Sequence, residues 1–323
     1  MLKGRAAWIA AAALAVMVLA TLLSLGQGEV RIAPAELLAA LWRADGSENA
    51  FIVRELRLPR VAVGLLVGAA LGMAGAIVQA ATRNPLGSPD LMGVSAGAAL
   101  TIVAAHLLLE LPTAGMVLIG TLGGALAAAI TVVIAWKSRL HPVHLTLAGM
   151  SVAVFCSSAI MVFLVAAANE ANGLYFWLIG GLADRTAAHA GQLAPWVLGG
   201  LLLGMLFARQ LNMLMLDDDS CQALGVPVLR WRLLTGLAAV MLTAASVAVA
   251  GPIAFVGLMV PHIVRLSAGP LAADHRVLLP LCALAGAAVV ALADVAAKAQ
   301  DIPVGILTVA LGGPLFVYLI GKR

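Results

Sequence analysis

The sequence contains few charged residues. Only 11% of its 323 residues are Asp, Glu, Lys or Arg, whereas soluble globular proteins carry about 25%. Hydrophobic residues make up 63% of the chain, which leaves too little polar surface to cover a domain folded in water. The composition therefore excludes an ordinary soluble domain and indicates a polytopic membrane protein.

Cysteine is scarce and scattered. The three cysteines, Cys156, Cys221 and Cys282, are predicted to lie in one apolar run, a polar loop and another apolar run. Their spacing fits neither a disulfide framework nor a metal site. We therefore predict no bound metal and no cofactor.

Catalytic and nucleotide-binding motifs are also lacking. The chain has no HExxH or GxSxG motif, no cluster of carboxylates in its apolar runs, and no phosphate loop of the GxxxxGK[ST] type. The sequence therefore predicts a protein that is not an enzyme and that takes energy from another chain or from an ion gradient. An ion-coupled porter should carry buried ionisable residues on its pathway, and Asp294 is the one acid well inside an apolar run. This porter is the alternative from another functional class.

Long apolar runs fill most of the sequence. Runs of 15 to 25 residues predict membrane-spanning helices, and ten are found, at about 6–26, 61–81, 91–109, 114–136, 145–167, 192–208, 233–250, 253–268, 278–297 and 303–320. The first run exceeds the roughly 7–15 residues of a signal-peptide core, so we expect it to be retained. The longest polar stretches, about 27–58 and 209–232, are too short to form an independent core. We expect residues 1–323 to form a single transmembrane domain.

The distribution of charge predicts the orientation. Ten spans place both termini on one side, and with that side in the cytoplasm most of the 19 lysines and arginines lie inside, as the positive-inside rule requires. Arg54, Arg57 and Arg60 are the exception, because they gather on the predicted outer side. These arginines call for a separate explanation.

One apolar run contains several helix breakers. The segment GPIAFVGLMVPHIVRL, residues 251–266, contains Gly251, Pro252 and Pro261. Proline removes an amide donor, and within a bilayer the freed carbonyls need partners from protein or from a wet cavity. We expect these breaks to line a solute pathway. In the second run, Gly64, Gly68 and Gly72 predict close approach of a neighbouring helix.

Six sequence blocks together resemble a known family. They are LRLPR (56–60), RNPLGSPDLMGVSAGAAL (83–100), QALGVPVLRWR (222–232), GPIAFVGLMVPHIVRL (251–266), DHRVLLP (274–280) and IPVGILTVALGGPLF (302–316). In this order they are similar to the signature blocks of the iron-chelate (siderophore), cobalamin and haem permease family. Its members are the membrane subunits of type II ABC importers. The resemblance runs from about residue 50 to the end and implies an all-α permease of about ten transmembrane helices, several short or broken, in the bacterial inner membrane.

The resemblance implies a docking role for the outer basic residues. In the family, arginines matching Arg57 and Arg60 bind acidic residues of a periplasmic binding protein, and guanidinium suits that role because it binds carboxylates bidentately. A third family arginine aligns with Lys298, which Asp294 could hold as an i, i+4 pair. Contact with lipid phosphates is the alternative explanation.

A predicted inner loop resembles the family's coupling helix. This short element docks into a groove on the cytoplasmic ATPase, and Ala223, Leu224, Gly225 and Val226 match it. Small residues allow close docking, and a rigid element transmits the motion driven by nucleotide. A solvated loop is the alternative.

Two segments resemble the family's cytoplasmic gate. Asn84 and Leu86 follow the second run, and the resemblance implies that Leu86 closes the pathway while Asn84 pairs with backbone. An Asn-Pro turn is the local structure expected in either case. The second segment is His141, Pro142 and Val143, whose histidine we expect to be an interfacial polar residue rather than a metal ligand, because no third ligand is near in sequence.

The resemblance also implies the partners and the cargo. The partners are a cytoplasmic ATPase dimer, a second permease subunit that is identical or paralogous, and a periplasmic substrate-binding protein, with no nucleic acid. A pathway of Ala, Gly, Val, Leu and Met has little capacity to bind iron directly, so the metal would travel inside its chelator. Ferric siderophore or ferric dicitrate is the first expectation, and cobalamin and haem are the alternatives.

Overall fold

The computed structural model describes residues 2–28, 30–42, 47–109, 113–138, 140–167 and 172–321. These residues form helices and connecting turns, with no strand among them. They include eight helices long and apolar enough to cross a membrane and two shorter apolar helices, 94–109 and 304–317. The ten predicted spans and the all-α fold are therefore confirmed.

The ten apolar helices match the ten predicted runs in order. They are α1 (Leu2–Gly26), α4 (Leu58–Ala81), α5 (Val94–Leu109), α6 (Thr113–Ala135), α7 (Pro142–Ala167), α9 (Ala187–Leu206), α12 (Val228–Ala250), α13 (Val256–Ala268), α14 (His275–Gln300) and α15 (Val304–Gly321). Most extend a few residues beyond the apolar run, because a helix can continue into the polar boundary, where water satisfies its end groups.

Shorter helices join the long ones. They are α2 (Pro34–Trp42), α3 (Glu48–Phe51), the π-helix η1 (Ile52–Arg57), η2 (Pro89–Met92), η3 (Trp136–Ser138), α8 (Asn172–Leu178), α10 (Ala208–Leu214), α11 (Asp218–Ala223) and η5 (Gly269–Ala273). Hydropathy did not predict them, because each is much shorter than a membrane span.

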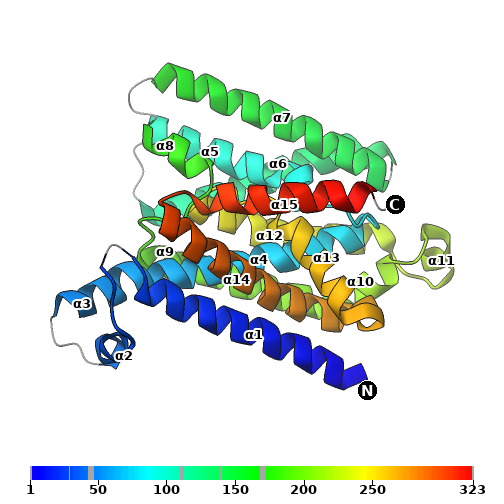
Figure 1. The fold of residues 1–323 in the computed structure, drawn as a ribbon. Coiled ribbons are helices and arrows are strands. Elements are labelled where there is room, and N and C mark those ends of the chain that lie inside the picture. The colour runs from blue at the N-terminus through cyan, green and yellow to red at the C-terminus, as the bar shows by residue number, and fades with distance from the viewer. Residues whose placement is uncertain are drawn as a thin grey trace.

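The long helices lie roughly side by side, so the bundle has two ends (Figure 1). Both chain termini, α10 and α11 lie at one end, which we call the terminal face. At the other end, the opposite face, lie α2, α3 and α8. Each face gathers several of the residues that the sequence analysis singled out.

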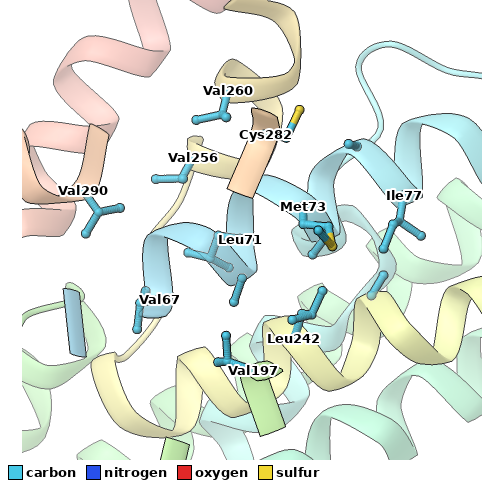
Figure 2. Packing of buried hydrophobic residues seen from close by; sticks show 14 of the residues in the cluster. Val67, Leu71, Met73, Ile77, Val197, Leu242, Val256, Val260, Cys282 and Val290 are labelled. Atoms are coloured by element: carbon cyan, nitrogen blue, oxygen red, sulfur yellow. The ribbon is translucent and has the colours of Figure 1, made fainter. Parts of the chain in front are cut away.

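Helix α4 lies at the centre of the bundle. Figure 2 shows Leu71 and Met73 of α4 among Val197 of α9, Leu242 of α12 and Val256 of α13. All five side chains are at most 5% exposed. Because lipid is as apolar as these residues, close van der Waals packing holds the helices together rather than a hydrophobic drive between them.

Glycines bring α4 and α14 into backbone contact. A methyl carbon placed on Gly68 would lie 2.4 Å from the carbonyl oxygen of Gly286, and one on Gly72 would lie 2.3 Å from that of Cys282. Neither position has room for a side chain. The close approach predicted for this glycine series is confirmed.

The polar stretch 27–58 is more helical than expected. Residues 48–81 form one continuous helix through α3, η1 and α4. Pro59 has no amide to continue the α-helical pattern, and just before it the Leu58 amide donates to the Val53 carbonyl, the five-residue step of a π-helix. The helix therefore begins well before the apolar run at 61–81, because the π-helical step accommodates Pro59 within it.

The predicted break between the eighth span and its predecessor is confirmed. Between α12 and α13 the chain is not helical, and Gly251 (φ 69°) and Phe255 (φ 68°) both have positive φ. At this break the Ala250 carbonyl accepts from the Gly181 amide at 2.8 Å. The neighbouring Gly180 carbonyl accepts from the Gly305 amide, in the first turn of α15, at 2.9 Å. Non-helical backbone is thus satisfied by protein, as a membrane interior requires.

The prolines of this segment have different effects. Pro252 lies in the non-helical stretch, whereas Pro261 lies inside α13 without ending it. Pro261 cannot donate to the Gly257 carbonyl, and this oxygen lies so close to α4 that a methyl carbon on Gly75 would be 1.8 Å from it. That the breaks line a pathway stays a prediction.

Candidate functional site

At the opposite face, Arg57 is a buried residue. It is 8% exposed, and its guanidinium donates to the carbonyls of Leu25, at 2.7 Å, and Val30. These carbonyls belong to the end of α1 and the segment after it. Arg57 therefore ties this segment to the π-helix.

Arg60 and Lys298 share one buried acid. Asp294 is 2% exposed and accepts from Arg60 Nε at 2.9 Å, with the Lys298 Nζ 3.5 Å from its other oxygen. Ser24 of α1 donates to the same carboxylate at 3.1 Å, and its carbonyl accepts from Lys298 at 3.1 Å. The predicted i, i+4 pair is confirmed. Two cations on one carboxylate leave this cluster with a net positive charge.

The three predicted docking residues line a single cavity of about 950 Å³. Its rim comes from the segment after α1, η1, the end of α8, residues 181–186, and the turn between α14 and α15. Acidic side chains also line it, namely Glu55, Asp184 and Asp301. The structure thus brings Arg57, Arg60 and Lys298 together, although all three side chains are bonded within the chain.

Arg185 is a lining residue that the sequence analysis missed. Its Nε atom is buried and has no hydrogen-bond partner among the described residues. Burial lowers the pKa of the Arg185 guanidinium, and Asp184 opposes that effect. The sequence feature that could have predicted Arg185 is its basic side chain on the same predicted outer side as Arg57.

At the terminal face, α11 is a short helix with well-formed ends. The Asp217 carboxylate caps it by accepting from the Ser220 amide at 2.8 Å and the Ser220 hydroxyl at 2.7 Å. These bonds, the amide bond first, lower the pKa of Asp217. At the other end Gly225 (φ 71°) turns the chain, with the Gly225 amide bonded to the Gln222 carbonyl and the Val226 amide to that of Cys221, both at 2.9 Å. This is a Schellman motif with glycine at its left-handed position.

Cys221 attaches α11 to the protein, whereas the residues at the C-terminal end of α11 are exposed to solvent. The buried Cys221 thiol donates to the Met213 carbonyl at 3.2 Å, and burial raises the pKa of this thiol. Ala223, Leu224 and Gly225 are exposed, Leu224 by 61%. Figure 1 shows α11 projecting from the terminal face. The predicted coupling residues therefore form a rigid, apolar projection.

The first predicted gate segment is a turn stabilised by Asn84. The Asn84 side-chain oxygen accepts from the Leu86 amide at 3.0 Å, and its carbonyl accepts from the Gly87 amide at 2.9 Å. The expected Asn-Pro turn and the pairing of Asn84 with backbone are confirmed. Leu86 is partly exposed in this turn.

The second predicted gate segment lies at the start of α7, at the same face. His141 is exposed and Val143 is 58% exposed, while Pro142 begins the helix. The His141 and His144 rings meet edge to face with centroids 5.8 Å apart. Among the described residues no group of three His, Cys, Asp or Glu could hold a metal. Met92, which follows the first gate segment, packs against the cluster containing Leu140, just before the second.

The fold and its two contrasting ends define a class of membrane transport subunit. A solved chain described as an inward-facing conformation of a metal-chelate type ABC transporter has a TM-score of 0.84 to this chain, with 27% identity over 98% of this chain and all of that one. The chain belongs to the FecCD transport family, whose model matches residues 16–322. It is accordingly an ABC importer permease and not an enzyme.

The similar permeases are named for different substrates. The chain is 38% identical to a Fe(3+)-citrate import permease, YfmD of Bacillus subtilis, over 93% of this chain and 90% of that protein. It is 38% identical to the Fe(3+) dicitrate permease FecC of Escherichia coli over 84% and 83%. It is 37% identical to the vitamin B12 permease BtuC of Salmonella paratyphi A over 98% and 95%.

A more distant structure supports the fold alone. PsaBC of Streptococcus pneumoniae, solved with a Fab, contains a chain with a TM-score of 0.60 and 16% identity over 88% of this chain and 95% of that one.

Proposed function

We propose that this chain is the membrane-spanning subunit of an ATP-driven importer that moves an iron chelate, ferric dicitrate or a ferric siderophore, from a periplasmic binding protein into the cytoplasm. Residues 1–323 act as one permease domain. Two relatives named for ferric citrate support the cargo. Cobalamin is the second candidate, because a vitamin B12 permease is almost equally similar over more of the chain.

The terminal face is assigned to the cytoplasm of a bacterial inner membrane. Basic residues gather there, among them Arg83, Arg209, Arg230, Arg232 and Arg276. A cytoplasmic excess of Lys and Arg is the usual determinant of orientation. Both termini then lie in the cytoplasm.

The observation that carries the ATP-driven mechanism is the exposed tip of α11. Leu224, flanked by Ala223 and Gly225, is an apolar projection on a short, capped helix. A rigid apolar projection fits a groove on a partner and moves with it as a body. The partner is a dimer of cytoplasmic ATPase subunits, and a second permease subunit completes the pathway.

The opposite face is assigned to the binding protein. Arg60 and Lys298 share the single carboxylate of Asp294, so their cluster keeps positive charge that acidic residues of a partner would complement. Arg57 contributes by holding the segment that forms part of the cavity rim. Its role in docking is therefore to shape the surface.

Uptake by the reconstituted transporter tests this function. The chain, its ATPase, its membrane partner and its binding protein are placed in vesicles, and accumulation of radioactive ferric citrate and of cobalamin is measured with ATP. We expect ATP-dependent accumulation of the ferric chelate. Accumulation of cobalamin but not of the ferric chelate would replace the proposed cargo. If neither compound accumulated even with the ATPase and ATP present, the proposed importer function would be contradicted.

A further inference from the structure

We propose that Asp218 is a positioning residue that links the coupling projection to the cytoplasmic gate, through a clamp formed by Arg83, Asp218 and Arg232. This inference rests on the proposed roles of α11 and of the Asn84 turn. It adds the physical connection between them, which neither the sequence motifs nor the relatives supply.

The clamp joins three elements at the terminal face. Asp218 lies in the first turn of α11, Arg83 lies two residues after the end of α4, and Arg232 lies in the second turn of α12. One Asp218 oxygen accepts from Arg83 at 2.8 Å and from Arg232 at 2.9 Å, and the other accepts from Arg232 at 3.2 Å. Asp218 therefore binds Arg232 through both oxygens and Arg83 through one.

Arg232 connects α11 to α12, whereas Arg83 connects α11 to the end of α4. Arg232 is 6% exposed, and the bidentate contact fixes α11 to the membrane helix α12. Arg83 also donates to the Leu216 carbonyl at 3.0 Å, in the segment just before α11. The Arg83 side chain thus holds both the helix and its approach segment against the end of α4.

The backbone at Arg83 shows that this side chain is retained at a conformational cost. The Arg83 amide donates to the Ala80 carbonyl at 3.2 Å and the Asn84 amide donates to that of Gln79 at 3.1 Å, which is a Schellman motif with Arg83 (φ 49°) at the left-handed position. Glycine is the residue that this position favours.

The same motif at the end of α11 has the favoured glycine. There Gly225 (φ 71°) takes the position that Arg83 takes at the end of α4. The Schellman motifs at the ends of α4 and α11 therefore differ in the residue at the left-handed position. The conformational cost of arginine at this position indicates that its side chain is needed, and the side chain provides the bonds to Asp218 and Leu216.

The clamp leads directly to the gate turn. Asn84 follows Arg83, and its side chain holds the Leu86 amide. A displacement of α11 must either carry Arg83 and this turn along or break the bond to Asp218. Packed elements linked in this way switch between discrete arrangements rather than deform continuously.

Replacing Arg83 by Gly is the sharpest test. Glycine keeps the left-handed backbone and removes only the side chain, while the Asp218 contact with Arg232 stays. The exposed Arg209 on α10 at the same face provides a matched control as Arg209→Gln. The complete transporter in vesicles is assayed for ATPase association, for ATP hydrolysis, and for chelate uptake per ATP hydrolysed.

We expect Arg83→Gly to leave ATPase association and hydrolysis near their normal levels and to lower uptake per ATP about tenfold or more, with Arg209→Gln unchanged. Unchanged uptake per ATP would overturn the link. Loss of ATPase association in Arg83→Gly would overturn it as well, because the clamp would then only shape the docking surface. Absence of ATPase association in the wild-type chain would instead refute the coupling role of α11.

A double-mutant cycle separates the link from a general effect of charge. If Arg83 acts through Asp218, adding Arg83→Gly to Asp218→Asn should lower uptake per ATP by far less than it does in the wild-type chain. Independent, multiplying effects of the two substitutions would show that Arg83 acts on the gate without Asp218, contrary to the proposal.

Discussion

Arg57 is bonded within the chain rather than free to bind a partner directly. Its guanidinium is satisfied by the carbonyls of Leu25 and Val30. We expect Arg57→Gln to destabilise the folded chain by about 1.5–3 kcal/mol, the usual contribution of hydrogen bonds to a charged group. Thermal unfolding in detergent measures this. The exposed Arg31, changed to Gln, is the control, and equal stability of the two variants would contradict the structural role.

Lys298 gives the cleaner test of docking. In Lys298→Gln, Asp294 keeps its ion pair with Arg60, so the fold should tolerate the change, while the opposite face loses one positive charge. We expect several-fold weaker binding of the binding protein, because the docking surface loses a positive charge that complements acidic residues of the partner. Binding is measured on chains in nanodiscs. Lys298→Arg should bind normally, and normal binding by Lys298→Gln would remove this residue from the docking surface.

The residue-level predictions succeeded where the partner is local. The Asp294–Lys298 pair and the Asn84 turn follow from spacing of four and two residues. The partners of Arg57 and Asp218 could not be predicted, because each depends on a segment brought near by tertiary folding. The acid run that contains Asp218 looks like an ordinary solvated loop until Arg83 is placed beside it.

Among the helices, α11 carries the prediction for ATPase docking. Its Gly225 has positive φ, so a bulky residue there would distort the turn as well as block docking. Leu224 is exposed and has negative φ. We expect Leu224→Glu to abolish or strongly weaken ATPase association in a pull-down, whereas Leu229→Glu, on the neighbouring α12, leaves it intact. Retained association in Leu224→Glu would exclude α11 as the docking element.

The break before α13 carries a prediction about stability. Gly251 has φ 69° and ψ 178°, a region that is essentially restricted to glycine, and a methyl carbon there would lie 2.0 Å from the Trp177 carbonyl oxygen. We expect Gly251→Ala to cost at least about 1–3 kcal/mol and to reduce the yield of folded protein. Gly236→Ala in α12 meets nothing within 4 Å and should be tolerated. A normal melting temperature for Gly251→Ala would contradict the tight packing of these breaks.

Span positions could be predicted because bilayer thickness fixes the length of an apolar run. The elements that hydropathy missed are those that position the candidate sites. Helix α11 has only six residues and depends on its caps, and the π-helix depends on Pro59 within a longer helix. Their formation reflects local hydrogen bonding and tertiary contacts, to which a hydropathy average is insensitive.

For the whole molecule, we expect transport to require ATP and no ion gradient. The chain has no phosphate loop, and Asp294, the acid inside α14, is already bonded to Arg60, Lys298 and Ser24. Uptake into vesicles should therefore persist when an ionophore collapses every ion gradient. Uptake by this chain alone, driven by a pH step and abolished by Asp294→Asn, would favour the ion-coupled porter.

The anchoring of α1 determines when during synthesis the molecule can be completed. Helix α1 packs along α14, and its Ser24 bonds to Asp294, 270 residues later in the chain. At about 5–20 residues per second of translation, α1 waits in the membrane for roughly 15–50 s before this partner is made. During that interval the end of α1 can already bond to Arg57, whereas its long contact with α14 must wait until α14 is made.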